Sequence, residues 1–480
     1  MSTVQSAPPR VPPERRVWCN RTLNFRAIRA VGYDMDYTLV HYRTEAWEQA
    51  AFESALGPLA ARNWPIEGLH FDPVSVIQGL AFDLELGNLV KATRFGYVIQ
   101  AHHGTRPLTF EAQREIYGST FVDLGEPRWE FMNTLFSLSE ANLFAQLVDK
   151  LEAGEFPENL SYRDLHRILR GALDEAHNLG ELKSQIAANP DRFVELDPEL
   201  PLTLLDQKEA GKRLLLVTNS DWGYTSSMMS YALDRFLPDG MKWRDLFDLV
   251  IVEARKPAFF SGRHAVYRLV DEQRGLLQPH RSTLEPGGAY VGGDALLVES
   301  SLGLSGAQIL YVGDHLFGDV HVSKDMLRWR TGLILREIEP EILALEESRQ
   351  AEGELKALMS SKIELDNRIA HLRLARQRVQ QGYGPQLAAG NAKALEAAIK
   401  GGADESLALD ARIAPLAKAF GALGNPAWGP LMRAGNDKSL FARQVERYAD
   451  VYTSRVSNFL AATPFAYLRA ARGSLPHDHS

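Results

Sequence analysis

Five short apolar runs, most of them followed closely by polar or glycine residues, constrain the fold of this chain more than any other feature. They occupy residues 27–33, 213–217, 249–253, 308–312 and 332–335. Runs of this length and composition are typical of strands that are buried on both faces of a parallel sheet. Helix-compatible segments separate most of them, which predicts an α/β fold with a Rossmann-like, doubly wound parallel sheet. Such sheets place their chemistry beyond the carboxyl ends of the strands.

The long gap between the first two runs predicts a domain inserted into the sheet. About 180 residues separate these runs, far more than a crossover helix requires. Amphipathic patterns over 140–152 and 162–178 predict helices there, so we expect a mostly helical cap. The core then consists of residues 20–60 and 201–340, and residues 61–200 form the inserted cap. A helical arm follows over residues 341–435. A C-terminal helical segment, residues 436–475, packs on the core.

A seven-residue repeat of apolar residues follows the last run. Its members, with the alternate core positions included, are Leu355, Leu358, Leu365, Ile369, Leu372 and Val379. This pattern predicts a coiled-coil hairpin arm or an oligomer contact. An amphipathic helix packed on its own domain fits equally well, because Lys362 and Arg376 interrupt the stripe. Further on, apolar residues from Phe441 to Phe459 at three- and four-residue spacing predict one final helix.

The overall charge and the single cysteine exclude several classes of protein. A net charge of −8, from 53 Lys and Arg against 61 Asp and Glu, argues against nucleic acid or an anionic membrane as a partner. No 18 consecutive apolar residues occur, so we expect no membrane-spanning helix. Cys19 alone can form neither a disulfide framework nor a cysteine-rich zinc site, which fits a cytoplasmic protein. A cysteine phosphatase would need an arginine six positions on, where Phe25 stands.

Two carboxylates follow the first run. Asp34 and Asp36 stand where the backbone leaves the predicted strand and begins to turn, so both can address one pocket. One carboxylate can attack a phosphoryl group as a nucleophile, and the other can pass a proton to the leaving oxygen. An Asp-x-Asp pair also arises by chance in a chain of this length, and its place after a strand and before Thr38 and Leu39 gives it weight.

Polar residues follow the second and third runs as well. Thr218, Asn219 and Ser220 offer a hydroxyl and backbone N–H groups that suit a phosphate oxygen, although such a stretch, taken alone, is more often a helix N-cap. Lys256, just before Pro257, offers a positive charge to a developing phosphoryl charge. A solvated loop lysine is the alternative interpretation of Lys256.

An acidic pair follows the fourth run. Asp314 and Asp319, on a turn that contains glycine, suit a hard cation such as Mg²⁺. A competing copy has Asp294 and Glu299 at the same offset, so spacing does not choose between the two pairs. The longer apolar run before Asp314 and the additional turn at Gly318 favour the first pair, with Asp294 as a helix cap.

The order of these motifs resembles the haloacid-dehalogenase superfamily, in which Asp-x-Asp is followed by Thr or Ser, then Lys, then an acidic pair. The amino-acid sequences of the motifs are similar to those of the cytosolic purine 5′-nucleotidase family, whose best-known members prefer IMP and GMP. The shared stretches read Asp-Met-Asp-Tyr-Thr-Leu, Thr-Asn-Ser-Asp, Arg-Lys-Pro-x-Phe-Phe and Val-Gly-Asp-His-x-Phe-Gly-Asp. Residues 169–177 of the cap and 439–468 near the C-terminus extend the resemblance over about residues 20 to 475.

The resemblance implies an enzyme that uses Mg²⁺ to hydrolyse nucleoside 5′-monophosphates, purine ones in particular, through an aspartyl-phosphate. Nucleoside phosphotransfer would be a second outcome of the same intermediate. Asp34 would be the nucleophile and Asp36 the acid and base, with Thr218 and Lys256 completing the catalytic set. Mg²⁺ would be held by the Asp34 carboxylate, the Asp36 carbonyl and Asp314, with Asp319 in support. We also expect a homo-oligomer, either a dimer or a tetramer.

The residues that the resemblance places at the substrate fall into two groups. Those at the phosphate are Thr218, Asn219, Ser220 and Lys256, and those at the nucleoside are Phe136, Arg170, Asp174, His177 and Lys183. Arg170, Asp174 and His177 share one helix face by their spacing, so an exposed face of a cap helix explains them equally well.

Departures from the family leave part of the function open. Ser137 stands where family members carry an asparagine beside the base, so the base preference is open. Asp325 lies in a stretch that is lysine-rich in the family near a nucleotide effector site, so control by ATP-like effectors is not assumed. The alternatives are a phosphatase for another small phosphate monoester and a catalytically silent binding protein. No G-x-G-x-x-G follows the first run, which argues against a dinucleotide-dependent dehydrogenase.

Overall fold

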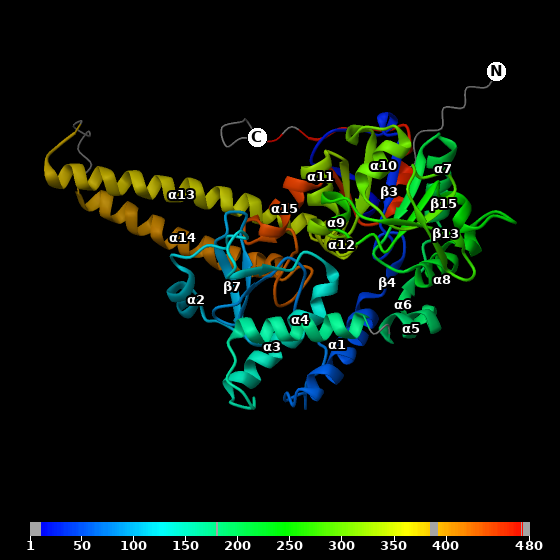
Figure 1. The fold of residues 1–480 in the computed structure, drawn as a ribbon. Coiled ribbons are helices and arrows are strands. Elements are labelled where there is room, and N and C mark those ends of the chain that lie inside the picture. Colours follow the sequence, from blue (N-terminus) through cyan, green and yellow to red (C-terminus); the bar gives the residue numbers. More distant parts are fainter. Residues whose placement is uncertain (1–10, 179–180, 385–391, 472, 474–480) are drawn as a thin grey trace, which may run out of the picture. The chain divides into compact units, whose positions relative to one another are not determined.

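A computed structural model describes residues 11–178, 181–384, 392–471 and 473 (Figure 1). Two compact units make up the chain: residues 1–339 together with 431–480, and residues 340–430. Among the helices of the described ranges, none is long and apolar enough to cross a membrane.

A ten-stranded sheet forms the centre of the first unit. The five runs predicted as strands lie side by side in the order β17-β16-β3-β11-β12, and every neighbouring pair among them is parallel. The predicted α/β fold with a parallel central sheet is therefore confirmed. The five strands are β3 (Ala30–Tyr33), β11 (Arg213–Val217), β12 (Leu249–Val252), β16 (Ile309–Gly313) and β17 (Arg330–Ile334).

Five further strands extend this sheet. β15 (Gly288–Gly292) and β20 (Val451–Thr453) continue the parallel part, while β1 (Trp18–Cys19), β13 (Val266–Asp271) and β14 (Leu276–His280) run antiparallel to their neighbours. All residues of β3, β12 and β16 are buried, which explains why these runs lack the alternation of a half-exposed strand. The helices between the central strands are α7 (Leu200–Glu209), α8 (Trp222–Leu233), α9 (Ala258–Ser261), α10 (Ala295–Leu302) and α11 (Val322–Leu327).

The segment between β3 and β11 combines helices with a second sheet. The two helices predicted there are present as α3 (Leu138–Glu152) and α4 (Tyr162–Asn178). The other elements outside the second sheet are β4 (His41–Tyr42), α1 (Thr44–Ala61), α2 (Phe110–Tyr117), α5 (Glu181–Ala188), α6 (Pro190–Phe193) and β10 (Val194–Glu195).

The second sheet was not predicted. It is antiparallel, with the order β8-β7-β6-β5-β9. Asp83 is fully buried in it and receives hydrogen bonds from the Arg128 guanidinium at 2.6 and 3.0 Å. The strands escape sequence analysis because they are short and β6 is buried throughout, so they show little alternation. They are β5 (Ala81–Asp83), β6 (Asn88–Ala92), β7 (Val98–His103), β8 (Arg106–Pro107) and β9 (Trp129–Phe131).

The C-terminal segment corrects one prediction. Instead of one helix from Phe441 to Phe459, α15 (Leu440–Tyr448) ends before β20, which joins the central sheet beside β17. The buried carboxylate of Asp450 holds this turn by pairing with Arg21, Lys324 and Arg330 at 2.6 to 2.7 Å. Such long-range pairs leave no local signal in the sequence. The remaining short elements are α16 (Phe459–Ala462), β2 (Leu23–Asn24) paired with β21 (Tyr467–Leu468), and β18 (Arg433–Ala434) paired with β19 (Asp437–Lys438).

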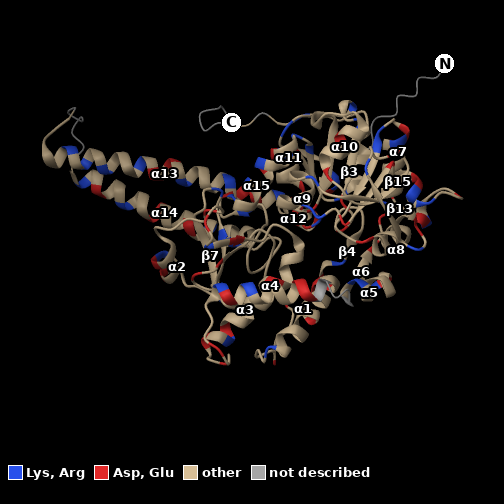
Figure 2. Ribbon diagram, in the orientation of Figure 1, with Lys and Arg blue, Asp and Glu red and all other residues tan. Residues whose placement is uncertain are grey.

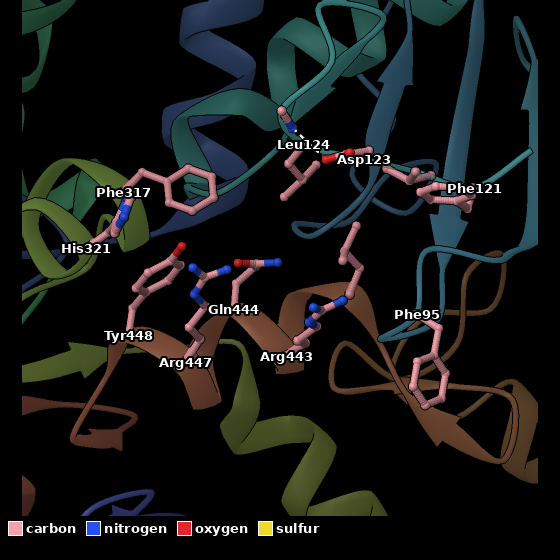
Figure 3. A pocket seen from close by; sticks show the side chains of 13 residues that line it. Phe95, Phe121, Asp123, Leu124, Phe317, His321, Arg443, Gln444, Arg447 and Tyr448 are labelled. Atoms are coloured by element: carbon pink, nitrogen blue, oxygen red, sulfur yellow. Dashed lines mark hydrogen bonds between the residues drawn. The ribbon is translucent and has the colours of Figure 1, made fainter. Parts of the chain in front are cut away.

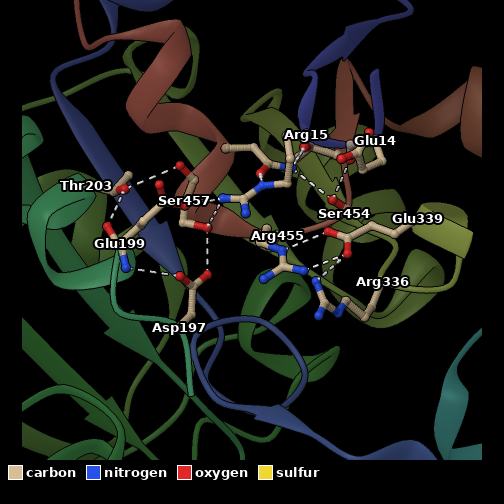
Figure 4. Close-up of polar contacts among 12 residues, drawn as sticks. Glu14, Arg15, Asp197, Glu199, Thr203, Arg336, Glu339, Ser454, Arg455 and Ser457 are labelled. Carbon is tan, nitrogen blue, oxygen red and sulfur yellow. Dashed lines mark hydrogen bonds and ion pairs between the residues drawn. The ribbon is translucent and has the colours of Figure 1, made fainter. Parts of the chain in front are cut away.

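A polar cluster beyond β20 ties distant segments together (Figure 4). Arg455 donates two hydrogen bonds to the Glu339 carboxylate, at 2.6 and 2.7 Å, and only about one seventh of either side chain is exposed. Ser457 donates to Asp197 at 2.6 Å and accepts from Arg15 at 3.1 Å. The cluster therefore joins the N-terminal segment, the start of α7 and the chain after β20.

Replacing Arg455 with methionine should destabilise the first unit. The change leaves the partly buried Glu339 carboxylate without its bidentate partner, so we expect a loss of about 1–3 kcal/mol in the free energy of unfolding. Urea unfolding measures it. The matched control is Arg167→Met, which removes an exposed pair with Asp164 and should leave the midpoint unchanged. Equal midpoints for the two variants would contradict the role of the cluster.

The second unit is built around a helical hairpin. α12 (Ile338–Glu347) leads into it, and α13 (Arg349–Gln381) packs against α14 (Ala392–Gly421) through the buried Leu358, Leu365 and Ile369. Charges of both signs are spread along the two helices (Figure 2). Lys362, which interrupts the apolar stripe, pairs with Asp410 at 2.7 Å, while Val379 at the end of the repeat is 45% exposed. The repeat thus supplies the seam of the hairpin in its first half.

Candidate active site

A cavity of about 520 Å³ opens at the carboxyl ends of the central strands. Most of the residues predicted at the site line it, although they come from separate parts of the chain. They are Asp34, Asp36, Phe136, Lys183, Thr218, Asn219, Ser220, Lys256, Asp314 and Asp319. Further walls are formed by Trp47, Leu182, Pro257, His315, Phe317, Gly318, His321 and Val322.

Three carboxylates and one lysine form the charged centre of this cavity. Asp34, Asp314 and Asp319 are buried, and each offers an oxygen within 4.8 Å of the others. The Lys256 ammonium lies 2.7 Å from Asp34 Oδ1 and 2.8 Å from Asp319 Oδ1. The ammonium thus contacts two of the three carboxylates, and the excess of negative charge in the ionised cluster fits a divalent cation.

Burial controls the ionisation of these groups. It raises the pKa of Asp34 to about 7, against the opposing effect of Lys256, and it raises the pKa of Asp314 well above its usual range. Burial would lower the pKa of Lys256, but the Asp319 and Asp34 carboxylates raise it well above its ordinary value. Asp314 Oδ2 is buried and has no hydrogen-bond partner among the described residues. A hard cation would satisfy this oxygen, so the donor set fits Mg²⁺.

Local backbone structure brings the acids together. After β3 the carbonyl of Met35 accepts hydrogen bonds from the backbone of Thr38, Leu39 and Val40, and this turn presents Asp34 and Asp36 on one side. After β16 the π-helix η7 (Leu316–His321) returns Asp319 toward Gly313. A Cβ atom at Gly313 would lie 2.4 Å from Asp319 Oδ2, so only glycine allows this approach.

Hydroxyl groups hold the second aspartate of the pair. Ser220 Oγ donates to Asp36 Oδ2 at 2.8 Å, and Tyr42 OH donates to Asp36 Oδ1 at 2.6 Å. Tyr42 OH also lies 2.9 Å from Tyr224 OH, and Lys183 Nζ donates to Ser220 Oγ at 3.2 Å. Sequence reasoning missed both tyrosines, because β4 and α8 bring them to Asp36 only in the folded chain.

The polar residues after β11 have two different surroundings. Asn219 receives a hydrogen bond from the Lys256 backbone N–H at 2.7 Å and donates to the Lys256 carbonyl at 3.1 Å. Its amide therefore shapes the loop that carries the lysine. Thr218 Oγ1 accepts from the Ser220 backbone N–H at 3.1 Å. These contacts fix the ends of β11 and β12 relative to each other.

Two of the residues predicted at the nucleoside are not among those that line the cavity. Arg170 pairs with Glu130 at 2.7 Å and with Glu140 at 3.2 Å, so carboxylates of the cap already occupy its guanidinium. Asp174 is exposed, and neither residue lines the cavity. The side chain of His177 lies outside the described residues. The role of Arg170 and Asp174 at the nucleoside therefore stays a prediction.

The competing acidic pair has structural contacts. Asp294 caps α10 by accepting from the Leu297 backbone N–H at 2.9 Å. Glu299 accepts from Trp329 Nε1 at 2.7 Å. The helix cap expected at Asp294 is therefore observed.

A second pocket, of about 540 Å³, shares a wall with the first (Figure 3). Arg443, Gln444 and Arg447 enter it from α15, and Phe317 and His321 of η7 line both pockets. The His321 ring packs against Tyr448 in a tilted arrangement, with 4.0 Å between ring centroids, and its Nε2 lies 2.9 Å from Asp325 Oδ2. The stretch around Asp325, which departs from the purine 5′-nucleotidase pattern, is thus held by the contacts of His321 with Tyr448 and Asp325.

Comparison with known proteins agrees with these motifs. Residues 17–480 match the model of the 5' nucleotidase family. A 5'-nucleotidase domain-containing protein of Dictyostelium discoideum is 28% identical over 474 residues, which cover 96% of this chain and 74% of that protein. The 5'-nucleotidase domain-containing protein 2 of Homo sapiens is 31% identical over 345 residues, which cover 68% of this chain and 64% of that protein. These relatives support the broad family, and their names do not extend to the purine-preferring branch.

Proposed function

This chain belongs to the 5' nucleotidase family, and we propose that it is a Mg²⁺-dependent enzyme that hydrolyses nucleoside 5′-monophosphates to nucleoside and phosphate. The observation that carries this proposal is the meeting of Asp34, Asp314 and Asp319 with Lys256 at one cavity. Preference for purines, transfer of the phosphoryl group to another nucleoside, assembly into a homo-oligomer and a cytoplasmic location are finer parts of the same proposal.

The chain's own residues divide the reaction into two displacements. Lys256 and the Met35 backbone N–H hold Asp34 Oδ1, so we assign the attack on phosphorus to Oδ2. As the bond from phosphorus to the leaving oxygen breaks, Asp36 gives its proton to that oxygen. Asp36 then takes a proton from a water molecule, which attacks phosphorus and releases phosphate from Asp34.

The charges of the site have separate roles in this scheme. Asp34, Asp314 and the Asp36 carbonyl would hold Mg²⁺, with Asp319 beside them. When bound, Mg²⁺ offsets the negative charge of the phosphoryl oxygens. Lys256, in the loop after β12, supplies a second positive charge. Ser220 holds Asp36 in place through its 2.8 Å hydrogen bond.

The apolar part of the cavity lining supports a nucleoside as the leaving group. Trp47, Phe136 and Phe317 contribute aromatic rings to its lining, and Leu182 and Val322 contribute aliphatic groups. Flat heteroaromatic bases pack well on such surfaces. A sugar phosphate would leave this lining without an apolar partner.

A substrate panel tests the proposed activity. Nucleoside 5′-monophosphates and sugar phosphates are compared by kcat/KM, with Mg²⁺ and with excess EDTA. We expect the nucleotides to rank first, with purines ahead of pyrimidines, and EDTA to remove the activity. Nucleotides at the bottom of the ranking would contradict the proposal and would favour another small phosphate monoester as the substrate.

Binding of Mg²⁺ should release protons. In the metal-free protein burial raises the pKa of Asp34 to about 7, so this carboxyl is partly protonated near neutral pH, and burial also raises the pKa of Asp314. The metal binds the deprotonated form, so its affinity should increase as the pH rises from about 6 to 8. Calorimetry in buffers of different ionisation enthalpy measures the release. A binding enthalpy that is the same in every buffer would contradict it.

A further inference from the structure

Tyr311 of β16 contacts the charged centre from inside the protein. Its side chain is fully buried, and its hydroxyl accepts a hydrogen bond from Lys256 Nζ at 3.1 Å. The same hydroxyl donates to the carbonyl of Val217, the last residue of β11, at 3.0 Å. Because its hydrogen points to Val217, the hydroxyl can only accept from the lysine.

We propose that Tyr311 is a positioning residue that fixes the Lys256 ammonium for phosphoryl transfer, an inference that rests on the proposed function. An ammonium carries three hydrogens. Those of Lys256 have three partners in the structure: Asp34 Oδ1, Asp319 Oδ1 and the Tyr311 hydroxyl. Tyr311 is the uncharged partner, so it sets the direction of the ammonium without adding negative charge to a crowded acidic site.

A glycine in the neighbouring strand β3 leaves room for the Tyr311 side chain. Tyr311 is paired in register with Gly32 of β3, and β3 separates β16 from β11. A Cβ atom at Gly32 would lie 2.9 Å from Tyr311 Cδ2, so the ring can cross β3 only because position 32 has no side chain. Phe260 packs edge-on against the ring, with 5.1 Å between centroids.

The contact with Val217 connects the lysine to the phosphate end of the site. Val217 immediately precedes Thr218, which lines the cavity. One hydroxyl therefore joins the end of β11 to Lys256 in the loop after β12. The alternative to a positioning role is a purely structural one, in which Tyr311 packs in the core and its hydroxyl needs only the Val217 carbonyl as a partner.

Tyr311→Phe tests the proposal, with Tyr290→Phe as the matched control. Both tyrosines are fully buried and precede a Val-Gly turn, but the Tyr290 hydroxyl accepts only from the Glu285 backbone N–H, at 2.8 Å, among the contacts of the described residues. Phenylalanine retains the ring packing, so both variants should fold. We expect kcat of Tyr311→Phe to fall about tenfold with KM within about twofold, and Tyr290→Phe to match the wild type.

A binding measurement separates positioning from general packing. Beryllium fluoride with Mg²⁺ mimics a phosphoryl group on an aspartate, and calorimetry gives its affinity. With Lys256 present, Tyr311→Phe should weaken the affinity for beryllium fluoride about tenfold. In a protein that already carries Lys256→Met, adding Tyr311→Phe should leave this affinity unchanged, because the hydroxyl acts through the lysine. Equal weakening in both backgrounds, or unchanged kcat in Tyr311→Phe, would overturn the proposal.

The same experiment distinguishes this proposal from the proposed function. A wild-type protein that binds beryllium fluoride but hydrolyses no phosphate monoester refutes the function alone, and the binding cycle still decides the role of Tyr311. A wild-type protein that neither binds nor hydrolyses overturns both. An active wild type with unaffected Tyr311→Phe overturns only the positioning role.

Discussion

Asparagine in place of Asp34 should abolish phosphate release and leave the fold intact. The amide is a far weaker nucleophile than a carboxylate, so we expect turnover to fall by at least about 10⁴-fold. Phosphate release is measured with Mg²⁺ and the best substrate of the panel. Normal release by Asp34→Asn would contradict the assignment of the nucleophile.

The stability of the same variant provides a second observation. Burial raises the pKa of Asp34 to about 7, so its ionised form is disfavoured in the folded metal-free protein. This carboxyl contributes stability at low pH, and the contribution is lost as the pH rises through about 7. Asp34→Asn carries no such charge, so at pH 8 without metal its free energy of unfolding should be at least as large as that of the wild type.

Asp294→Asn is the matched control for Asp34→Asn. Asp294 belongs to the competing acidic motif and caps α10. Its replacement should leave turnover at the wild-type level, because the structure places its carboxylate at a helix N-terminus and not at the cavity. Loss of turnover in Asp294→Asn would show that Asp294 and Glu299, and not Asp314 and Asp319, are the functional acidic pair after the strands.

Methionine in place of Lys256 should have the second-largest effect. The change removes the ammonium that faces Asp34 and Asp319 and that would balance the developing phosphoryl charge. Removal of one such group typically reduces kcat by about 10²- to 10³-fold, which is the result that we expect. Steady-state kinetics at saturating Mg²⁺ measures it.

Lys212→Met is the matched control for Lys256→Met. Lys212 is also buried, but its ammonium donates to the backbone carbonyls of Phe25 and Ile28, at 2.6 and 2.9 Å. Its loss should change stability and leave kcat within about twofold. If both variants lose activity equally, the effect comes from the loss of a buried charge in general and not from the chemistry of Lys256.

Local sequence patterns predicted the centre of the fold because buried parallel strands are apolar along their whole length. β11 begins and ends at the predicted residues, and the other four strands lie within about three residues of their predicted bounds. The motif residues stand at strand ends, and parallel strands of one sheet end on the same side. The sequence could therefore predict that Asp34, Thr218 and Asp314 meet.

Long-range contacts account for what the sequence could not predict. Asp450 is held by arginine and lysine residues more than 100 positions away, so the strand after α15 has no local signal. Arg170 shares a helix face with residues expected at the nucleoside, yet its partners are Glu130 and Glu140. The contribution of Tyr311 depends on Gly32, which belongs to another strand.

Trapping of the phosphorylated enzyme tests the central claim most directly. The protein is mixed with Mg²⁺ and substrate, quenched within one turnover and treated with borohydride, which reduces an aspartyl-phosphate to homoserine. Mass spectrometry then locates the modified residue. Our account predicts homoserine at position 34 that disappears when Mg²⁺ is omitted. Turnover without modification at Asp34, or modification at another aspartate, would contradict it.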